Sequence, residues 1–167
     1  MDGGSGWPYG PAVRPDQFRE ALSRWASGVT VVATEHEGVR SGLTASAFTS
    51  VSLEPSLVLV CVERRAESAE ALRRAATFGI SILAESQQGE ALQMARSGHE
   101  KFDGLPFFAG PVTGQPLLEG ALAHFECRLF RIDEGGDHLL VLGEVLAAHT
   151  HDRTPLVYYH RGFHGVR

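Results

Sequence analysis

Residues 40–62 read R-S-G-L-T-A-S-A-F-T-S-V-S-L-E-P-S-L-V-L-V-C-V, with few strong helix formers and many β-branched or hydroxyl-bearing side chains. Such residues favour β-structure, and the run predicts strands at 40–45, 48–52 and 57–62. Pro55 separates the last two strands, because proline cannot donate to a sheet ladder. This part of the chain is therefore predicted to be a series of short strands.

Strand patterns continue on both sides of this run. The β-branched residues 29–32 predict an earlier strand, and further strands are predicted at 78–83, 121–130, 139–147 and 156–159. In 121–130, apolar side chains alternate with His124, Glu126 and Arg128, as in a half-buried strand. Residues 139–147 are apolar on both faces. We expect one face in the core and the other under a helix or a second subunit.

Three short helices interrupt the strands. An apolar stripe of Phe18, Leu22, Trp25 and Ala26 predicts a helix that opens at Pro15. The other helices are expected at 67–76 and 88–97, and residues 98–118 are expected to form a long surface loop.

This order of elements indicates the fold class. Because the helices do not alternate regularly with the strands, a doubly wound sheet is disfavoured. We predict a mainly β fold, largely antiparallel and barrel-like, with two or three short peripheral helices.

Length and composition favour one globular domain. The 167 residues suit a single domain, expected at 15–167 after a mobile, Gly/Pro-rich tail at 1–14. Fifteen Lys and Arg against twenty Asp and Glu give a net charge of −5 without a basic stripe, which argues against a nucleic-acid partner. No apolar run has the length of a membrane helix, and the start lacks signal-peptide features.

The cysteines and histidines point to no metal site. Cys61 and Cys127 lie in apolar runs without C-x-x-C spacing, so we expect buried free thiols and a cytoplasmic protein. His149 and His151 would share one strand face, which a metal could use, but the pair borders a polar loop at Asp152 and Arg153 and a completing zinc ligand set is not evident. Surface histidines are therefore the preferred interpretation. Haem ligation by His124, His149 or His160 is a weaker alternative, since a lone histidine is poor evidence for it.

Known nucleotide and hydrolase motifs are missing from the sequence. There is no G-x-G-x-x-G after a strand, no G-x-x-x-x-G-K-[ST] and no G-x-S-x-G. Residues 42–52 are instead rich in small and hydroxyl side chains, which let a flat ligand approach the main chain. Composition alone also fits an ordinary Ser/Thr-rich strand pair.

Several segments together resemble one known family. They are G-V-T-V-V-A-T (28–34), G-L-T-A-S-A-F-T-S-V-S (42–52), E-P (54–55) before L-V-L-V (57–60), F-G-I-S-I-L (78–83), Gln87, K-F (101–102), G-D-H (136–138) and P-L-V-Y-Y (155–159). In this order and spacing the chain resembles the flavin reductase-like family over residues 16–164. Members are reductase components of two-component flavin-dependent monooxygenases.

The resemblance implies a fold, an activity and partners. It implies a split β-barrel that binds FMN or FAD, a homodimer with flavin near the subunit boundary, and reduction of the flavin by NADH or NADPH. The reduced flavin would pass to a partner oxygenase. A flavin-binding carrier or sensor without reductase activity is the alternative, because fold alone does not settle function.

The resemblance also implies roles for individual residues. The residues expected to line the isoalloxazine are Thr44, Ala45, Ser46, Ala47, Ser50, Val51 and Ser52. Cys61 and Val62 lead into the implied phosphate region, where Ser68 and Arg64 or Arg65 would meet a phosphate at a helix start. Plain N-capping by Ser68 is the other interpretation, and Ala69 stands where many relatives carry Thr.

Two further positions complete the expected site. Gln87 matches a family position near the flavin, and the alternative for it is an ordinary loop glutamine. His138 in G-D-H matches a position on the nicotinamide side of the flavin and is the expected catalytic residue. The alternative for His138 is turn chemistry at the start of a strand.

Overall fold

The computed structural model describes residues 13–166. Most of the expected N-terminal tail falls in residues 1–12, which lie outside the described residues, as does residue 167. Within the described range, no helix combines the length and the apolar character needed to cross a bilayer.

Strands dominate the described chain, and the prediction of a mainly β fold is confirmed. The helices are α1 (Pro15–Leu22), α2 (Glu67–Arg74) and α3 (Gln88–Met94), with 3-10 turns η1 (Glu85–Gln87) and η2 (His99–Phe102). The strands are β1 (Ser27–Gly28), β2 (Thr30–His36), β3 (Val39–Ala45), β4 (Phe48–Leu53), β5 (Ser56–Glu63), β6 (Thr77–Ile82), β7 (Phe107–Ala109), β8 (Pro116–Leu118), β9 (Ala123–Gly135), β10 (His138–Thr150), β11 (Leu156–Tyr159) and β12 (Gly162–Gly165).

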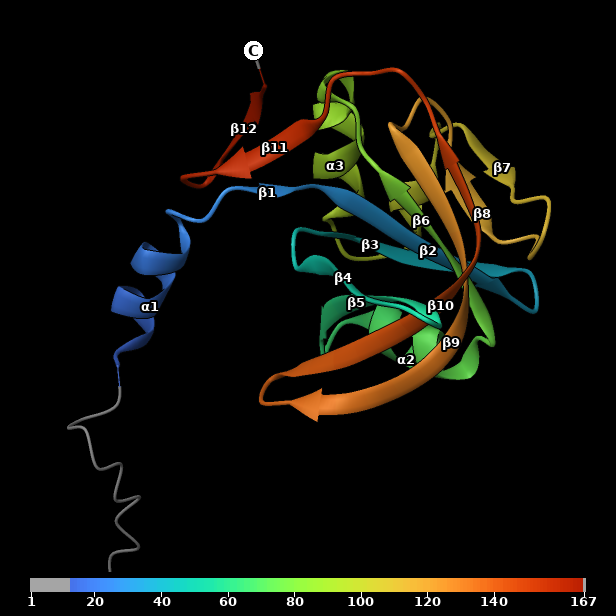
Figure 1. The fold of residues 1–167 in the computed structure, drawn as a ribbon, viewed down its shortest axis with the longest axis horizontal. Coiled ribbons are helices and arrows are strands. Elements are labelled where there is room, and N and C mark those ends of the chain that lie inside the picture. Colours follow the sequence, from blue (N-terminus) through green and yellow to red (C-terminus); the bar gives the residue numbers. More distant parts are fainter. Residues whose placement is uncertain (1–12, 167) are drawn as a thin grey trace, which may run out of the picture.

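Seven strands form one antiparallel sheet that curls on itself. Its order is β3-β2-β6-β9-β10-β5-β4, so β3 and β4 are its two edges. Only Ser46 and Ala47 join these edges in sequence. A link of two residues forces the edges together, and the sheet therefore closes into a barrel that is split between β3 and β4 (Figure 1).

The barrel interior is filled by the inward-facing side chains of its strands. Its fully buried apolar residues include Val60 and Val62 of β5, Phe78 of β6, Cys127 of β9 and Val141 of β10. Their alternation along each strand is the period-two pattern expected of a sheet with one buried face. A second apolar cluster lies between α3, β8 and β11, outside the barrel proper.

The segment 98–118 is not the irregular surface loop that its composition predicts. It contains η2 and a β7–β8 hairpin, and Leu117 and Leu118 are completely buried. The hairpin packs on β6 at Gly79, where an added Cβ would lie 2.5 Å from the Pro116 carbonyl oxygen. The absence of a side chain at Gly79 therefore lets the backbone of β8 approach the backbone of β6 closely. The Gly/Pro-rich composition of 98–118 gives no sign of this contact.

This hairpin also buries the polar face of β9. His124 and Glu126 were expected on the outward face, and both lie beneath residues 110–118. The Glu126 carboxylate accepts hydrogen bonds from the Val112 and Thr113 amides and the Thr113 hydroxyl, at 2.6–3.2 Å. The His124 Nε2 atom lies 2.8 Å from the Leu118 carbonyl oxygen, which accepts its hydrogen.

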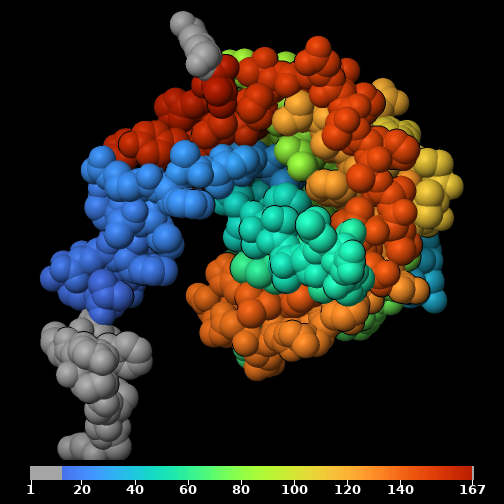
Figure 2. All heavy atoms as spheres, in the orientation of Figure 1, coloured from blue at the N-terminus to red at the C-terminus, as the bar shows by residue number. Residues whose placement is uncertain are grey.

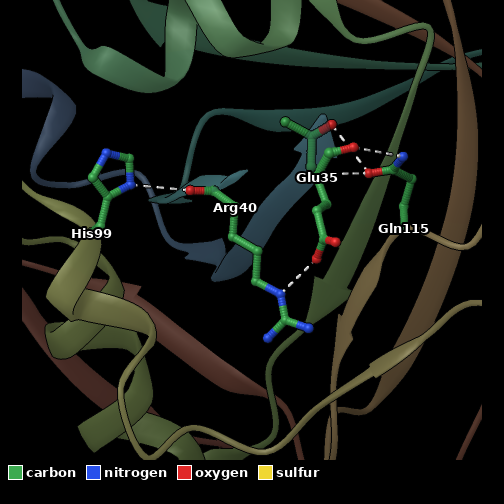
Figure 3. Close-up of polar contacts among 5 residues, drawn as sticks. Glu35, Arg40, His99 and Gln115 are labelled. Atoms are coloured by element: carbon green, nitrogen blue, oxygen red, sulfur yellow. Dashed lines mark hydrogen bonds and ion pairs between the residues drawn. The ribbon is translucent and has the colours of Figure 1, made fainter. Parts of the chain in front are cut away.

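Polar contacts fasten the same segment to the β2–β3 hairpin (Figure 3). Gln115 accepts a hydrogen bond from the Glu35 amide at 2.7 Å, and the His99 Nδ1 atom lies 3.3 Å from the Arg40 carbonyl oxygen. Arg40 in turn pairs with the Glu35 carboxylate at 2.8 Å. The segment is thus held at both ends.

Helix α1 is shorter than predicted and stands apart from the barrel (Figure 1). The predicted apolar stripe does not face the core of this chain. Phe18, Leu22 and Trp25 are exposed, Trp25 to 73%, and no residue of α1 is buried. The amide of His160 donates to the Ser23 carbonyl at 2.8 Å, and Arg161 pairs with Glu20 at 3.3 Å. The apolar stripe is therefore left without a cover from the described residues.

Candidate functional site

A cavity of about 440 Å³ lies where the barrel is split. Its walls come from the end of β3, the end of β5, the start of α2, the segment after α3, and the start of β10. This volume falls within the range of about 300–1,000 Å³ typical of small-molecule sites. The polar and small residues that line it include Thr44, Ala45, Ser46, Ala47, Cys61, Glu63, Arg65, Glu67, Ser68, Arg96, Lys101 and His138.

The link between β3 and β4 lines the cavity and carries unpaired main-chain donors. We call Ser46 and Ala47 the seam. Their carbonyls accept hydrogen bonds from Phe48 and Cys61, each at 3.0 Å, but within residues 13–166 their amides have no protein acceptor. The ladder stops here because the chain crosses from one sheet edge to the other. The seam therefore offers N–H groups beside small side chains to the polar edge of a ligand.

Cationic side chains line another part of the cavity wall. Lys101 is only 7% exposed, and its ammonium forms no ion pair within 4 Å among the described residues. Burial lowers the pKa of Lys101, and the nearby Glu67 carboxylate partly opposes that shift. Arg65 and Arg96 line the same cavity. A largely buried lysine whose ammonium has no protein partner gains from a negative charge beside it, so this wall favours an anionic ligand.

The start of α2 adds further donors at this wall. The N-cap residue is Ala66, not Ser68 as the capping interpretation had it, and no side chain caps the helix. Ser68 is buried and lines the cavity. An uncapped helix start leaves amide N–H groups that suit an anion.

His138 stands at the rim of the cavity, at the first position of β10. It lies opposite Glu63 of β5 in the sheet register, and both residues line the cavity. Its Nδ1 atom is 2.7 Å from the Asp137 carboxylate oxygen. A hydrogen bond to His138 is the main cause that lowers the pKa of Asp137. A carboxylate only accepts, so the shared hydrogen belongs to Nδ1, and Nε2 is left for other partners.

A second, more apolar hollow of about 670 Å³ adjoins the seam. It lies between α1 and the β4–β5 edge, and Figure 2 shows the depression between the blue helix and the teal strand. Leu22, Trp25 and Phe48 line it, and it shares Ser46, Ala47 and Cys61 with the first cavity. Burial raises the pKa of the Cys61 thiol, so this side chain stays neutral between the two spaces.

The structure gathers about half of the sequence-predicted site residues. Those that line the cavity are Thr44, Ala45, Ser46, Ala47, Cys61, Ser68 and His138. Thr44 also donates its hydroxyl to the Ala91 carbonyl at 2.7 Å, which ties β3 to α3. The predicted ring-binding, phosphate-binding and nicotinamide-side residues therefore meet in one place.

The structure places the other candidates outside this cavity. Ser50, Val51 and Ser52 lie farther along β4, and Val62 faces the barrel interior with no exposed surface. Arg64 contacts the β9–β10 turn, its guanidinium 2.8 Å from the Gly136 carbonyl oxygen.

Gln87 also points elsewhere. It accepts from the Ala84 amide at 3.1 Å and donates to the Glu119 carbonyl at 2.8 Å, so it joins η1 to the segment before β9.

Two cations of the site were assigned no role from the sequence. Lys101 lies in the segment that was expected to be a surface loop, and Arg96 follows α3. The available signal was the K-F pair at 101–102, which belongs to the family resemblance but carries no chemistry by itself. Sequence reasoning missed both because only the folded chain brings the segment 96–101 to the start of α2, where the Gly98 amide donates to the Glu67 carboxylate at 3.3 Å.

Comparison with known proteins agrees with this geometry. The family model described as "Flavin reductase like domain" matches residues 22–167. An NADH-dependent flavin reductase of Rhodococcus sp. is 44% identical over 159 residues, covering 93% of this chain and 89% of that protein. The reductase subunit HsaB of a flavin-dependent monooxygenase from Rhodococcus jostii is 34% identical over 164 residues, 98% of this chain and 84% of that protein.

A solved structure shares the whole fold. The NADH:FAD oxidoreductase SgcE6 of Streptomyces globisporus, determined with NAD and FAD fragments, superposes with a TM-score of 0.86 at 36% identity. The match covers 93% of this chain and 96% of that one. The curled sheet, the cavity at its split and the extent of these similarities lead to one assignment: this chain belongs to the flavin reductase-like family.

Proposed function

We propose that this protein is an NADH-dependent flavin reductase that supplies reduced FMN or FAD to a partner oxygenase. The observation that carries the proposal is the cavity that brings together unpaired seam amides, the unpartnered ammonium of the largely buried Lys101, and His138. A relative named as an NADH-dependent flavin reductase supports the activity, and a relative named as a monooxygenase reductase subunit supports the oxygenase partner.

The residues of the cavity fit a flavin. Ala45, Ser46 and Ala47 leave room for a planar ring, and the seam amides face its polar edge, where they favour negative charge that develops on reduction. Lys101, Arg65 and Ser68 supply cationic and hydroxyl groups for a phosphate. When bound, the flavin supplies the hydride-accepting chemistry, and the protein supplies its orientation and electrostatics.

His138 serves the nicotinamide in this proposal. It lines the cavity at the start of β10, and its Nδ1 atom is hydrogen-bonded to the Asp137 carboxylate. Nε2 is then free to contact the reduced nicotinamide donor or to accept a proton there. We expect His138→Ala to weaken the use of NADH while flavin affinity is retained.

We also propose a homodimer whose second subunit covers α1 and the hollow beside it. Leu22 and Trp25 of the exposed stripe line a hollow that shares Ser46, Ala47 and Cys61 with the flavin cavity. An isologous contact at this place buries the stripe and closes the site from one side. Leu22→Glu is expected to give a monomer by light scattering, and an unchanged dimer mass contradicts this arrangement.

A single domain at 15–167 in the cytoplasm completes the proposal. Cys61 and Cys127 are free thiols, which suits a reducing compartment.

Anaerobic titration tests the main proposal against the carrier alternative. Purified protein is titrated with FMN or FAD and then with NADH, while flavin absorbance is followed. Bleaching faster than in a protein-free mixture is expected of a reductase. Binding of flavin without accelerated bleaching establishes the carrier instead, and failure to bind either flavin refutes both.

A further inference from the structure

Arg64 is fastened to the turn that carries His138. Its side-chain Nη2 donates to the Gly136 carbonyl at 2.8 Å and lies 3.2 Å from the Glu134 carboxylate. Its main-chain amide donates to the Asp137 carbonyl at 2.9 Å. The residue that follows β5 thus holds the tip of the β9–β10 hairpin by two different groups.

The geometry of this β9–β10 turn sets the position of His138. Gly136 has a φ of +70°, a backbone conformation that glycine adopts without strain. Asp137 and His138 follow at once, and the Asp137 side chain is 92% exposed. An exposed contact such as that between Asp137 and His138 contributes little stability by itself. It is therefore retained only where the turn holds the two residues in place.

We propose that Arg64 is a positioning residue for His138. By fixing the Gly136 carbonyl, its guanidinium holds the turn in the conformation that keeps Asp137 on Nδ1 of His138 and keeps the imidazole at the cavity rim. The inference rests on the proposed role of His138 toward the nicotinamide.

The surroundings of Arg64 distinguish this role from phosphate binding. Its guanidinium contacts Gly136 and Glu134, and both Arg64 and Arg65 border a surface hollow of about 420 Å³ beside Asp137. Of the two arginines, Arg65 alone also lines the main cavity. A phosphate ligand would need its donors inside that cavity. Arg65 is therefore the arginine that can reach a ligand in the main cavity, whereas Arg64 is bonded to the hairpin.

Arg64→Ala tests the proposal with little risk to the fold. The substitution removes the guanidinium and leaves the main-chain bond to Asp137 in place. We expect KM for NADH to rise about three- to tenfold, the effect of one partly exposed charge-assisted hydrogen bond, with flavin affinity unchanged. Arg131→Ala is the matched control, because Arg131 is an exposed, ion-paired arginine on the same hairpin away from its turn.

A double-substitution cycle separates this inference from the role of His138. If Arg64 acts through His138, Arg64→Ala changes KM by less than about twofold in a His138→Ala background. Additive effects of the two substitutions, or an Arg64→Ala variant with weakened flavin binding, overturn the inference. If His138→Ala alone leaves NADH kinetics unchanged, it is the proposed role of His138 that fails.

The tautomer of His138 gives a readout that does not depend on turnover. Two-bond ¹⁵N–¹H spectra of histidine-labelled protein, assigned with the His138→Ala variant, are expected to show the Nδ1–H form in the parent protein. Arg64→Ala is expected to shift the population toward Nε2–H. An unchanged Nδ1–H population in Arg64→Ala contradicts the positioning role even where KM has risen.

Discussion

The unpartnered ammonium of Lys101 gives the sharpest test of how the cavity recognises its ligand. Lys101→Met keeps most of the length and the apolar character of the stem and removes the charge. Because Lys101 is 7% exposed and has no ion-pair partner among the described residues, the substitution breaks no salt bridge. We therefore expect folding stability to be retained or slightly increased, and the loss to fall on an anionic ligand.

The size of that loss follows from the kind of bond involved. A hydrogen bond to a charged group contributes about 1.5–3 kcal/mol, which corresponds to roughly 10- to 100-fold in a dissociation constant. Riboflavin has the same ring as FMN but no phosphate. Lys101→Met is thus expected to weaken FMN by that factor and riboflavin by less than about twofold.

Fluorescence titration with FMN and with riboflavin measures both constants on one protein preparation. Arg40→Met is the control, since Arg40 is paired with Glu35 outside the cavity. Equal weakening of FMN and riboflavin would mean that Lys101 shapes the ring site instead. No change in either constant would mean that the phosphate lies elsewhere, and each of these results refutes the reasoning.

Substitutions at three further residues probe the ring site and the hairpin that covers β9. Ser46→Trp is expected to lower flavin affinity at least about tenfold by filling the space beside the seam, whereas an unchanged titration in a folded variant places the ring elsewhere. Glu126→Ala leaves three donors of the hairpin without their acceptor and is expected to cost about 1–3 kcal/mol in urea unfolding, with Glu126→Gln losing less. Burial lowers the pKa of His124, so the unfolded chain binds its proton more readily; stability is expected to fall as pH drops from about 6.5 through the lowered value. His124→Gln should flatten that part of the pH profile, and a parallel profile would show that other groups cause it.

The sequence predicted the barrel strands well because their patterns are local. The alternation in 121–130 and the two-sided apolar run in 139–147 correspond to β9 and β10, although both strands extend further to Gly135 and Thr150. The ends were missed because a long hairpin continues by pairing with itself, whatever its polarity. Strand β12 was missed for the same reason.

The hairpin at 107–118 shows what local patterns do not contain. Its glycines and prolines predict a loop, and its burial depends on Gly79 in a distant strand. The polar residues His124 and Glu126 read as an outward face because their partners lie in that hairpin. The sequence of the hairpin alone and the sequence of β9 alone therefore do not predict that the two pack together.

In the candidate site, too, some residues could be predicted from local sequence and others only from the folded chain. The 42–47 segment and His138 were identified through motifs that the family resemblance supplied, and the structure places them around one cavity. Lys101 and Arg96 were assigned no role because their approach to α2 is a tertiary arrangement. Arg64 and Arg65 are adjacent in sequence, so only the direction of each side chain distinguishes them.

The unpaired amides of the seam have a consequence for how such a site changes over time. Point substitution replaces side chains, but it leaves a main-chain N–H in place unless the new residue is proline. Lineages are therefore free to exchange alanine, serine or glycine at Ser46 and Ala47 while the ligand meets the same donors. An amide-to-ester replacement by chemical synthesis is the direct way to remove one donor, and a conventional alanine scan will underestimate what this short link contributes.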